Sequence, residues 1–260
     1  MLIAIPVAAA VIAGSAALYA RAAGFPAGPA TGSIDGITTF LVCIALLALL
    51  VFGLKRHPEK SARLIVASVT IAGTLSGLIL LKVWMQASGV PPAMFLATLP
   101  LGYLGLNWSL KGYLGSLSQR KTNFLMLFSA SLLGALIGTS LPTIIGVLFL
   151  LSLTSLDVLV VEFGTLANMV GQSRYDEVVS VVTLPLDKFL VGIGDFLAYS
   201  VLASAALRDL GIYGAIETSV LILLGAILTF QITRRRKRAP GLLIPIGIGS
   251  IPLILGLAHV

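Results

Sequence analysis

The sequence predicts an all-α, polytopic membrane protein with nine transmembrane helices, and three observations lead to this fold class. Of its 260 residues, 58% are hydrophobic and only 10% are charged, whereas soluble domains carry about 25% charged residues. The apolar residues fall in blocks of about 18 to 24, the length a helix needs to cross a bilayer core of roughly 30 Å. Lys and Arg gather in alternate connections between these blocks, a pattern typical of multi-pass membrane proteins.

Nine blocks are long enough to be spans, at approximately 2–20, 37–54, 63–84, 93–110, 122–139, 141–163, 181–205, 211–232 and 240–258. The first block could instead be a secretory signal, but its length and the absence of preceding basic residues favour a span. Ser140-Leu141-Pro142 predicts a tight turn between the fifth and sixth spans. The Gly73-x-x-x-Gly77 and Gly134-x-x-x-Gly138 pairs are typical of close helix packing in membranes.

These spans divide the chain into three parts. Residues 1–163 form an N-terminal part of six spans, 164–180 a cytoplasmic connection, and 181–260 a C-terminal part of three spans. The connections after the even-numbered spans hold 14 of the 17 Lys and Arg residues. Because cytoplasmic loops are enriched in these residues, we expect a cytoplasmic N-terminus and an extracellular C-terminus. The basic run at 234–238 is then a topological anchor, and no nucleic-acid partner is expected.

Two of the ten acidic residues lie well inside predicted spans. Asp157 lies about six residues before the cytoplasmic end of the sixth span, and Asp195 lies seven residues after Lys188, at the cytoplasmic edge of the seventh. At 1.5 Å per residue, both lie roughly 9–11 Å inside the same face. A carboxylate at such depth costs roughly 2.5–3.5 kcal/mol, so both are functional candidates. If they meet, they share a proton, as the catalytic pair of an aspartic protease does.

Three short motifs resemble those of one protease family. Gly192-Ile193-Gly194-Asp195 resembles the GxGD motif of presenilins and signal peptide peptidases, which are nine-span intramembrane aspartyl proteases. That family also carries Tyr-Asp in its sixth span and Pro-Ala-Leu at the start of its ninth. In this chain Leu156-Asp157 and Pro240-Gly241-Leu242 stand at these places. The resemblance covers essentially the whole chain in span number, orientation and motif order.

The resemblance implies a presenilin-like fold and a function. Asp157 and Asp195 would activate water to hydrolyse peptide bonds within transmembrane segments or signal peptides, in the bilayer and without a metal or cofactor. Gly192, Gly194, Pro240, Gly241 and Leu242 would support the active site and the substrate. The compact loops indicate a microbial homologue in the plasma membrane. The sequence leaves open whether it forms a homo-oligomer or needs other subunits.

The chain departs from the family pattern at two places. The only literal Tyr-Asp, Tyr175-Asp176, lies in a polar segment that we expect to be a solvated loop, so we assign the first catalytic acid to Asp157. Gly241 replaces the family's Ala, a change that we expect to be sterically minor. The β-branched segment 178–186 is expected either to pair as a strand with an unwound substrate or simply to begin the seventh span.

Other functions fit the sequence less well. The two histidines are His57 and His259, and no His-Glu-x-x-His motif exists, which argues against a metalloprotease. The main alternative is a proton- or cation-coupled transporter that uses the same acid pair, with Glu217 on the same path. The sequence shows no internal repeat of the kind common in transporters.

Overall fold

The computed structural model describes residues 56–258, except 165–167, 169–170, 172–174, 176–178, 180–182, 187–188 and 237–238. The predicted spans at 2–20 and 37–54 lie outside the described residues, and so does Asp176. The described part of the chain is mostly helical, and four of its helices are long and apolar enough to cross a membrane: Arg63–Gln86, Arg120–Ser140, Thr143–Glu162 and Ile193–Arg235.

The helices follow the predicted spans with several differences. The observed elements are α3 (Pro58–Ala87), the 3₁₀ helix η1 (Pro92–Thr98), α4 (Leu99–Tyr113), α5 (Gln119–Ser140), α6 (Thr143–Glu162), β1 (Thr183–Leu186), β2 (Phe189–Gly192), α9 (Ile193–Arg236), α10 (Leu243–Gly249) and α11 (Ile251–Ala258). The predicted turn between the fifth and sixth spans is confirmed. Leu141 is extended there (φ −81°, ψ 138°), since the residue before a proline avoids helical geometry.

The prediction of a helix over 181–205 is wrong at its start. Thr183–Leu186 and Phe189–Gly192 form an antiparallel hairpin with Thr183 opposite Gly192, and the helix begins only at Ile193. Pro185 lies in β1 and lacks the N–H that a helix interior needs. Two short apolar runs joined by a two-residue connection are typical of a β-hairpin. The equal-depth estimate for Asp195, which assumed a helix from Lys188 onward, therefore fails.

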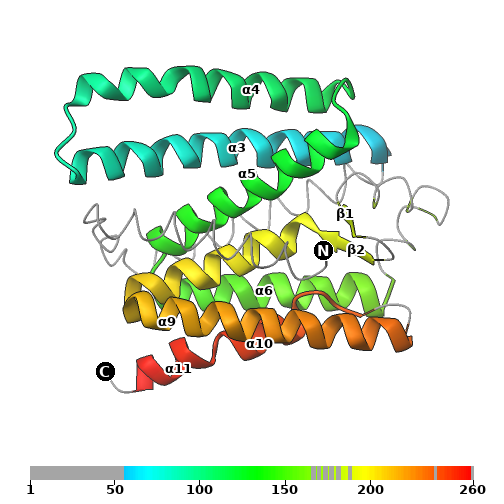
Figure 1. The fold of residues 1–260 in the computed structure, drawn as a ribbon. Helices are drawn as coiled ribbons and strands as arrows, with labels where there is room; N and C mark the ends of the chain where they lie inside the picture. Colours follow the sequence, from blue (N-terminus) through cyan, green and yellow to red (C-terminus); the bar gives the residue numbers. More distant parts are fainter. Residues whose placement is uncertain are drawn as a thin grey trace.

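The seventh and eighth spans meet at a sharp break at Gly211, with no loop between them. Gly211, with φ 78° and ψ −166°, interrupts α9, and Figure 1 shows the second arm returning beside the first. A glycine tolerates this positive φ without strain. Asp209, expected in a loop, instead lies in the last turn before this break. The expected ninth span is divided into α10 and α11 at Ser250.

Close packing of α5 on the first arm of α9 positions the site. A Cβ on Gly134 would lie 2.4 Å from the Leu197 carbonyl oxygen, and one on Gly138 would lie 2.3 Å from that of Val201. The Gly73 position is equally tight, with the Ser129 carbonyl oxygen at 2.2 Å. The predicted role of these glycines in helix packing is therefore confirmed. Gly134 and Gly138 let α5 pack closely against α9, which carries Asp195.

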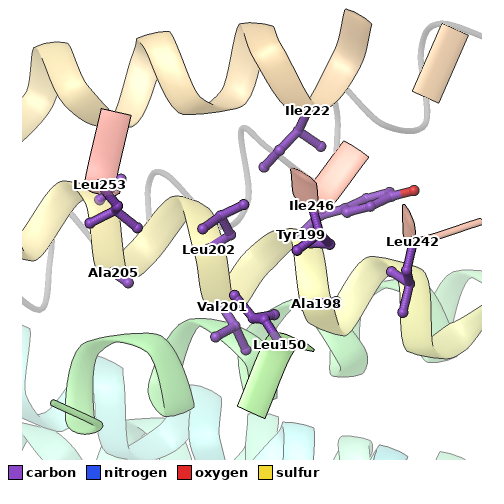
Figure 2. Close-up of a cluster of buried hydrophobic side chains, with 11 residues drawn as sticks. Leu150, Ala198, Tyr199, Val201, Leu202, Ala205, Ile222, Leu242, Ile246 and Leu253 are labelled. Atoms are coloured by element: carbon purple, nitrogen blue, oxygen red, sulfur yellow. The ribbon is translucent and has the colours of Figure 1, made fainter. Parts of the chain in front are cut away.

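A buried apolar cluster joins α6, α9 and α10. It includes Leu150 of α6, Leu202 and Ile222 of the two α9 arms, and Ile246 of α10. Figure 2 shows these side chains meeting between the helices, with Tyr199 beside Ile246. The cluster fixes the segment before α10 against the two helices that carry Asp157 and Asp195.

Candidate active site

Asp195 lies in the first turn of α9, directly after the hairpin. Its Oδ2 accepts a hydrogen bond of 3.2 Å from the backbone N–H of Gly192, the last residue of β2. An acid at the third helical position often satisfies the N–H at the helix start in this way. The backbone change from strand to helix thus sets the position of Asp195 and orients its carboxylate.

Asp157 lies on α6, five residues before the helix ends at Glu162. Its Oδ2 accepts a hydrogen bond of 2.9 Å from the backbone N–H of Leu242, which lies 85 residues later in the chain. The N–H of Gly241 is also directed to this carboxylate. Asp157 therefore holds the segment that leads into α10, and its side chain is only partly exposed.

Both carboxylates meet at Gly241. A Cβ on this glycine would lie 2.7 Å from Oδ2 and 3.0 Å from Oδ1 of Asp195, while the next residue binds Asp157. The two acids are within electrostatic reach of each other. A methyl group at position 241 would require the end of the Asp195 side chain to move. The Gly-for-Ala change, expected to be sterically minor, therefore affects the position of this carboxylate.

The other residues expected at the site differ in their surroundings. Pro240 and Leu242 are buried beside the acids, and Leu242 belongs to the apolar cluster. Gly192 touches Asp195 through its N–H, and a Cβ there would make only an ordinary contact at 3.7 Å. A Cβ on Gly194 would meet nothing within 4 Å. These two glycines mark the strand-to-helix junction and do not loosen the interior of a helix.

Tyr199 belongs to the site, although the sequence reasoning gave it no role. Its hydroxyl donates a hydrogen bond of 3.0 Å to the carbonyl oxygen of Gly241, and it lies within electrostatic reach of both carboxylates. The available signal was its spacing, because residues four apart on a helix share a face. Tyr199 follows Asp195 by four residues.

Three further acids whose side chains the structure describes are exposed or paired elsewhere. Glu162 and Glu217 are exposed, and Asp209 pairs with Arg208 at the far end of the first α9 arm, at 2.6 Å. Among the residues that the structure describes, no three His, Cys, Asp or Glu side chains come together as a metal site. The chemistry available at Gly241 is therefore that of two carboxyl groups, a phenol and backbone groups.

A scan against protein-family models gives no match for this chain, and no curated protein matches it significantly.

Proposed function

We propose that this chain is an intramembrane aspartyl protease of the presenilin and signal peptide peptidase type. One observation carries the proposal: carboxylates from α6 and α9 converge on the backbone of Gly241 and Leu242, in the order and motifs that the resemblance implies. The substrates would be transmembrane helices or signal peptides in the bilayer.

The acid pair is suited to peptide hydrolysis. Two carboxyl groups within electrostatic reach of each other do not both ionise at low cost. We therefore propose that Asp157 and Asp195 hold one proton between them. The ionised member takes a proton from water, whose oxygen attacks the scissile carbonyl carbon. The protonated member hydrogen-bonds the carbonyl oxygen as negative charge develops there. Collapse of the tetrahedral intermediate breaks the C–N bond, and the departing nitrogen takes a proton from the pair.

The hairpin before Asp195 supplies backbone groups for an unwound substrate. A helical substrate hides its carbonyls in its own hydrogen bonds, and a segment unwound in lipid needs new partners. The β1–β2 hairpin is a two-stranded sheet with no third strand among the described residues. We propose that the substrate pairs with an outer edge of this hairpin. Because β2 ends three residues before Asp195, such a strand would lie next to the acids.

The arrangement of the connections supports the proposed orientation. Figure 1 shows that the hairpin and the ends of α6 and α9 lie at one end of the helices, where α3 begins and α4 leads into α5. Most Lys and Arg residues of the chain belong to connections at this end. We propose that this end faces the cytoplasm, with the N-terminus on the same side and the chain in a microbial plasma membrane.

The deciding experiment is cleavage of a single-span test substrate by purified protein in liposomes. Asp157→Asn and Asp195→Asn should each lower kcat by about 10³-fold or more, because general acid–base catalysis contributes typically 10²- to 10⁴-fold. Glu162→Gln, an exposed acid on the same helix as Asp157, is the matched control and should retain activity. Asp176→Asn should also retain it; an inactive Asp176→Asn beside an active Asp157→Asn would reassign the first acid.

The Asn variants also separate catalysis from a purely structural role. Each carboxylate accepts a backbone N–H at the start of a helix, and the side-chain oxygen of Asn can accept the same bond, more weakly than an ionised carboxylate does. Each Asn variant therefore keeps the hydrogen bond at the start of the helix but loses the ability to donate or accept a proton in catalysis. Full cleavage by both Asn variants would refute the protease mechanism. Acid-dependent proton flux, with no cleavage by the wild type, would support the transporter.

A further inference from the structure

The Tyr199 hydroxyl connects the two acid-bearing helices through a single peptide group. It donates to the carbonyl oxygen of Gly241 at 3.0 Å. The N–H of that same peptide unit belongs to Leu242 and donates to Asp157 Oδ2 at 2.9 Å. Because C=O and N–H of a trans peptide point in opposite directions, the peptide is held from α9 on one side and from α6 on the other.

The surroundings of Tyr199 fix the position of its side chain. Its side chain is only 7% exposed and packs in the cluster with Leu202, Leu242 and Ile246. Figure 2 shows its ring extending from α9 toward the segment that carries Leu242. A buried tyrosine hydroxyl normally needs a hydrogen-bond partner, and here the partner is a backbone carbonyl. The ring is therefore fixed by packing, and its oxygen is fixed by the Gly241 carbonyl.

We propose that Tyr199 is a positioning residue that fixes the Gly241–Leu242 peptide and thereby orients the Asp157 carboxylate toward Asp195. This inference rests on the proposed protease function. The hydrogen bonds run in series, from the hydroxyl through the peptide to the carboxylate, and each polarises the next. Loss of the hydroxyl frees the carbonyl, lets the peptide rotate and weakens the N–H bond that holds Asp157.

A purely structural role for Tyr199 makes a different prediction. If the side chain only fills space, its ring is sufficient, and Tyr199→Phe leaves kcat and the exchange of the Leu242 amide unchanged. If the hydroxyl positions Asp157, Tyr199→Phe keeps the packing and removes only the hydrogen bond. Tyr213, which is 84% exposed on the second arm of α9, provides the matched Tyr→Phe control.

The test compares Tyr199→Phe with Tyr213→Phe and the wild type, using two measurements on the full chain in liposomes. In the cleavage assay, Tyr199→Phe should lower kcat by about 10- to 100-fold, with KM changed by less than about twofold, because the geometry of the acids is disturbed and substrate binding is not. In hydrogen–deuterium exchange, the Leu242 amide should exchange about 2- to 12-fold faster, the factor expected for losing one ordinary hydrogen bond. Tyr213→Phe should match the wild type in both.

Each outcome decides the proposal. An unchanged kcat in Tyr199→Phe overturns it. A lowered kcat with unchanged Leu242 exchange also overturns it, because the hydroxyl would then act elsewhere, for example on the substrate. If the wild type cleaves nothing, the proposed protease function fails, and the exchange measurement alone decides whether Tyr199 holds the peptide. A thermal midpoint within about 2 °C of the wild type shows that Phe preserves the fold.

Discussion

Replacing Gly241 by Ala should strongly lower the proposed protease activity without unfolding the protein. The added Cβ would lie 2.7 Å from Oδ2 and 3.0 Å from Oδ1 of Asp195, and both atoms belong to the end of one side chain. Such an end moves at small energetic cost, so the fold survives. The atoms that must move are, however, those that we propose to perform the chemistry.

The size of the displacement sets the expected loss. To reach an ordinary contact of 3.4 Å, the Asp195 carboxylate must retreat by about 0.7 Å, which exceeds the roughly 0.5 Å tolerance of a working site. A misplacement of about 1 Å can cost about 100-fold in rate. We therefore expect Gly241→Ala to lower kcat by about 10- to 100-fold, equivalent to roughly 1.4–2.7 kcal/mol of transition-state stabilisation.

The assay is cleavage of a single-span substrate in liposomes, beside thermal unfolding of each variant. Gly247→Ala is the matched control, since a Cβ at that exposed position of α10 meets nothing within 4 Å, and it should leave kcat unchanged. Wild-type activity in Gly241→Ala would refute the reasoning and show that this backbone accommodates the Ala found in the resembling family. Equal loss of activity in Gly241→Ala and Gly247→Ala would show that any added methyl group in or next to α10 disturbs activity, and that the contact with Asp195 is not the cause.

Two predictions concern the packing that supports the site. Arg208→Ala removes the hydrogen bonds to the carbonyl oxygens of Gly138 and Leu141 and the pairing with Asp209. It should cost about 1–3 kcal/mol, because these partly buried acceptors lose their donor. The thermal midpoint in detergent should fall by several degrees, whereas that of the exposed control Arg120→Ala should hardly change. Gly134→Ala drives a Cβ against the α9 backbone and should destabilise by about 1–3 kcal/mol. Gly146→Ala, which meets nothing within 4 Å, should be neutral or stabilising, and equal thermal midpoints for the two glycine variants would contradict the packing model.

The long helices were predictable because their signal is local. Apolar length predicts a membrane helix directly, and the α5–α6 turn follows from Pro142 alone. The hairpin was missed because a hydropathy reading does not separate a short apolar strand from the start of an apolar helix. The extension of the first α9 arm through Asp209, up to the break at Gly211, was missed for another reason. That acid is held in the helix by Arg208 and Thr143, and Thr143 comes from a distant part of the sequence.

The site was predictable only in part. Asp157 and Asp195 stand out because charge is costly in lipid, whereas Tyr199 resembles any other aromatic residue in a membrane helix. Its role depends on a hydrogen bond to Gly241, 42 residues away. The steric role of Gly241 likewise depends on the position of Asp195 in space. Such contacts depend on how α9 packs against α10. They join residues that are far apart in the chain, so a local sequence pattern does not predict them.

Helix capping alone explains each acid but not the pair. Asp195 accepts from the N–H of Gly192 and Asp157 from that of Leu242, and the side-chain oxygen of a neutral Asn could accept either bond. A carboxylate that is taken out of water carries a desolvation cost that a neutral Asn avoids. Placing both acids within electrostatic reach of each other adds repulsion. A structural site gains nothing from that repulsion, whereas two carboxyl groups that share one proton supply both the base and the acid that peptide hydrolysis needs.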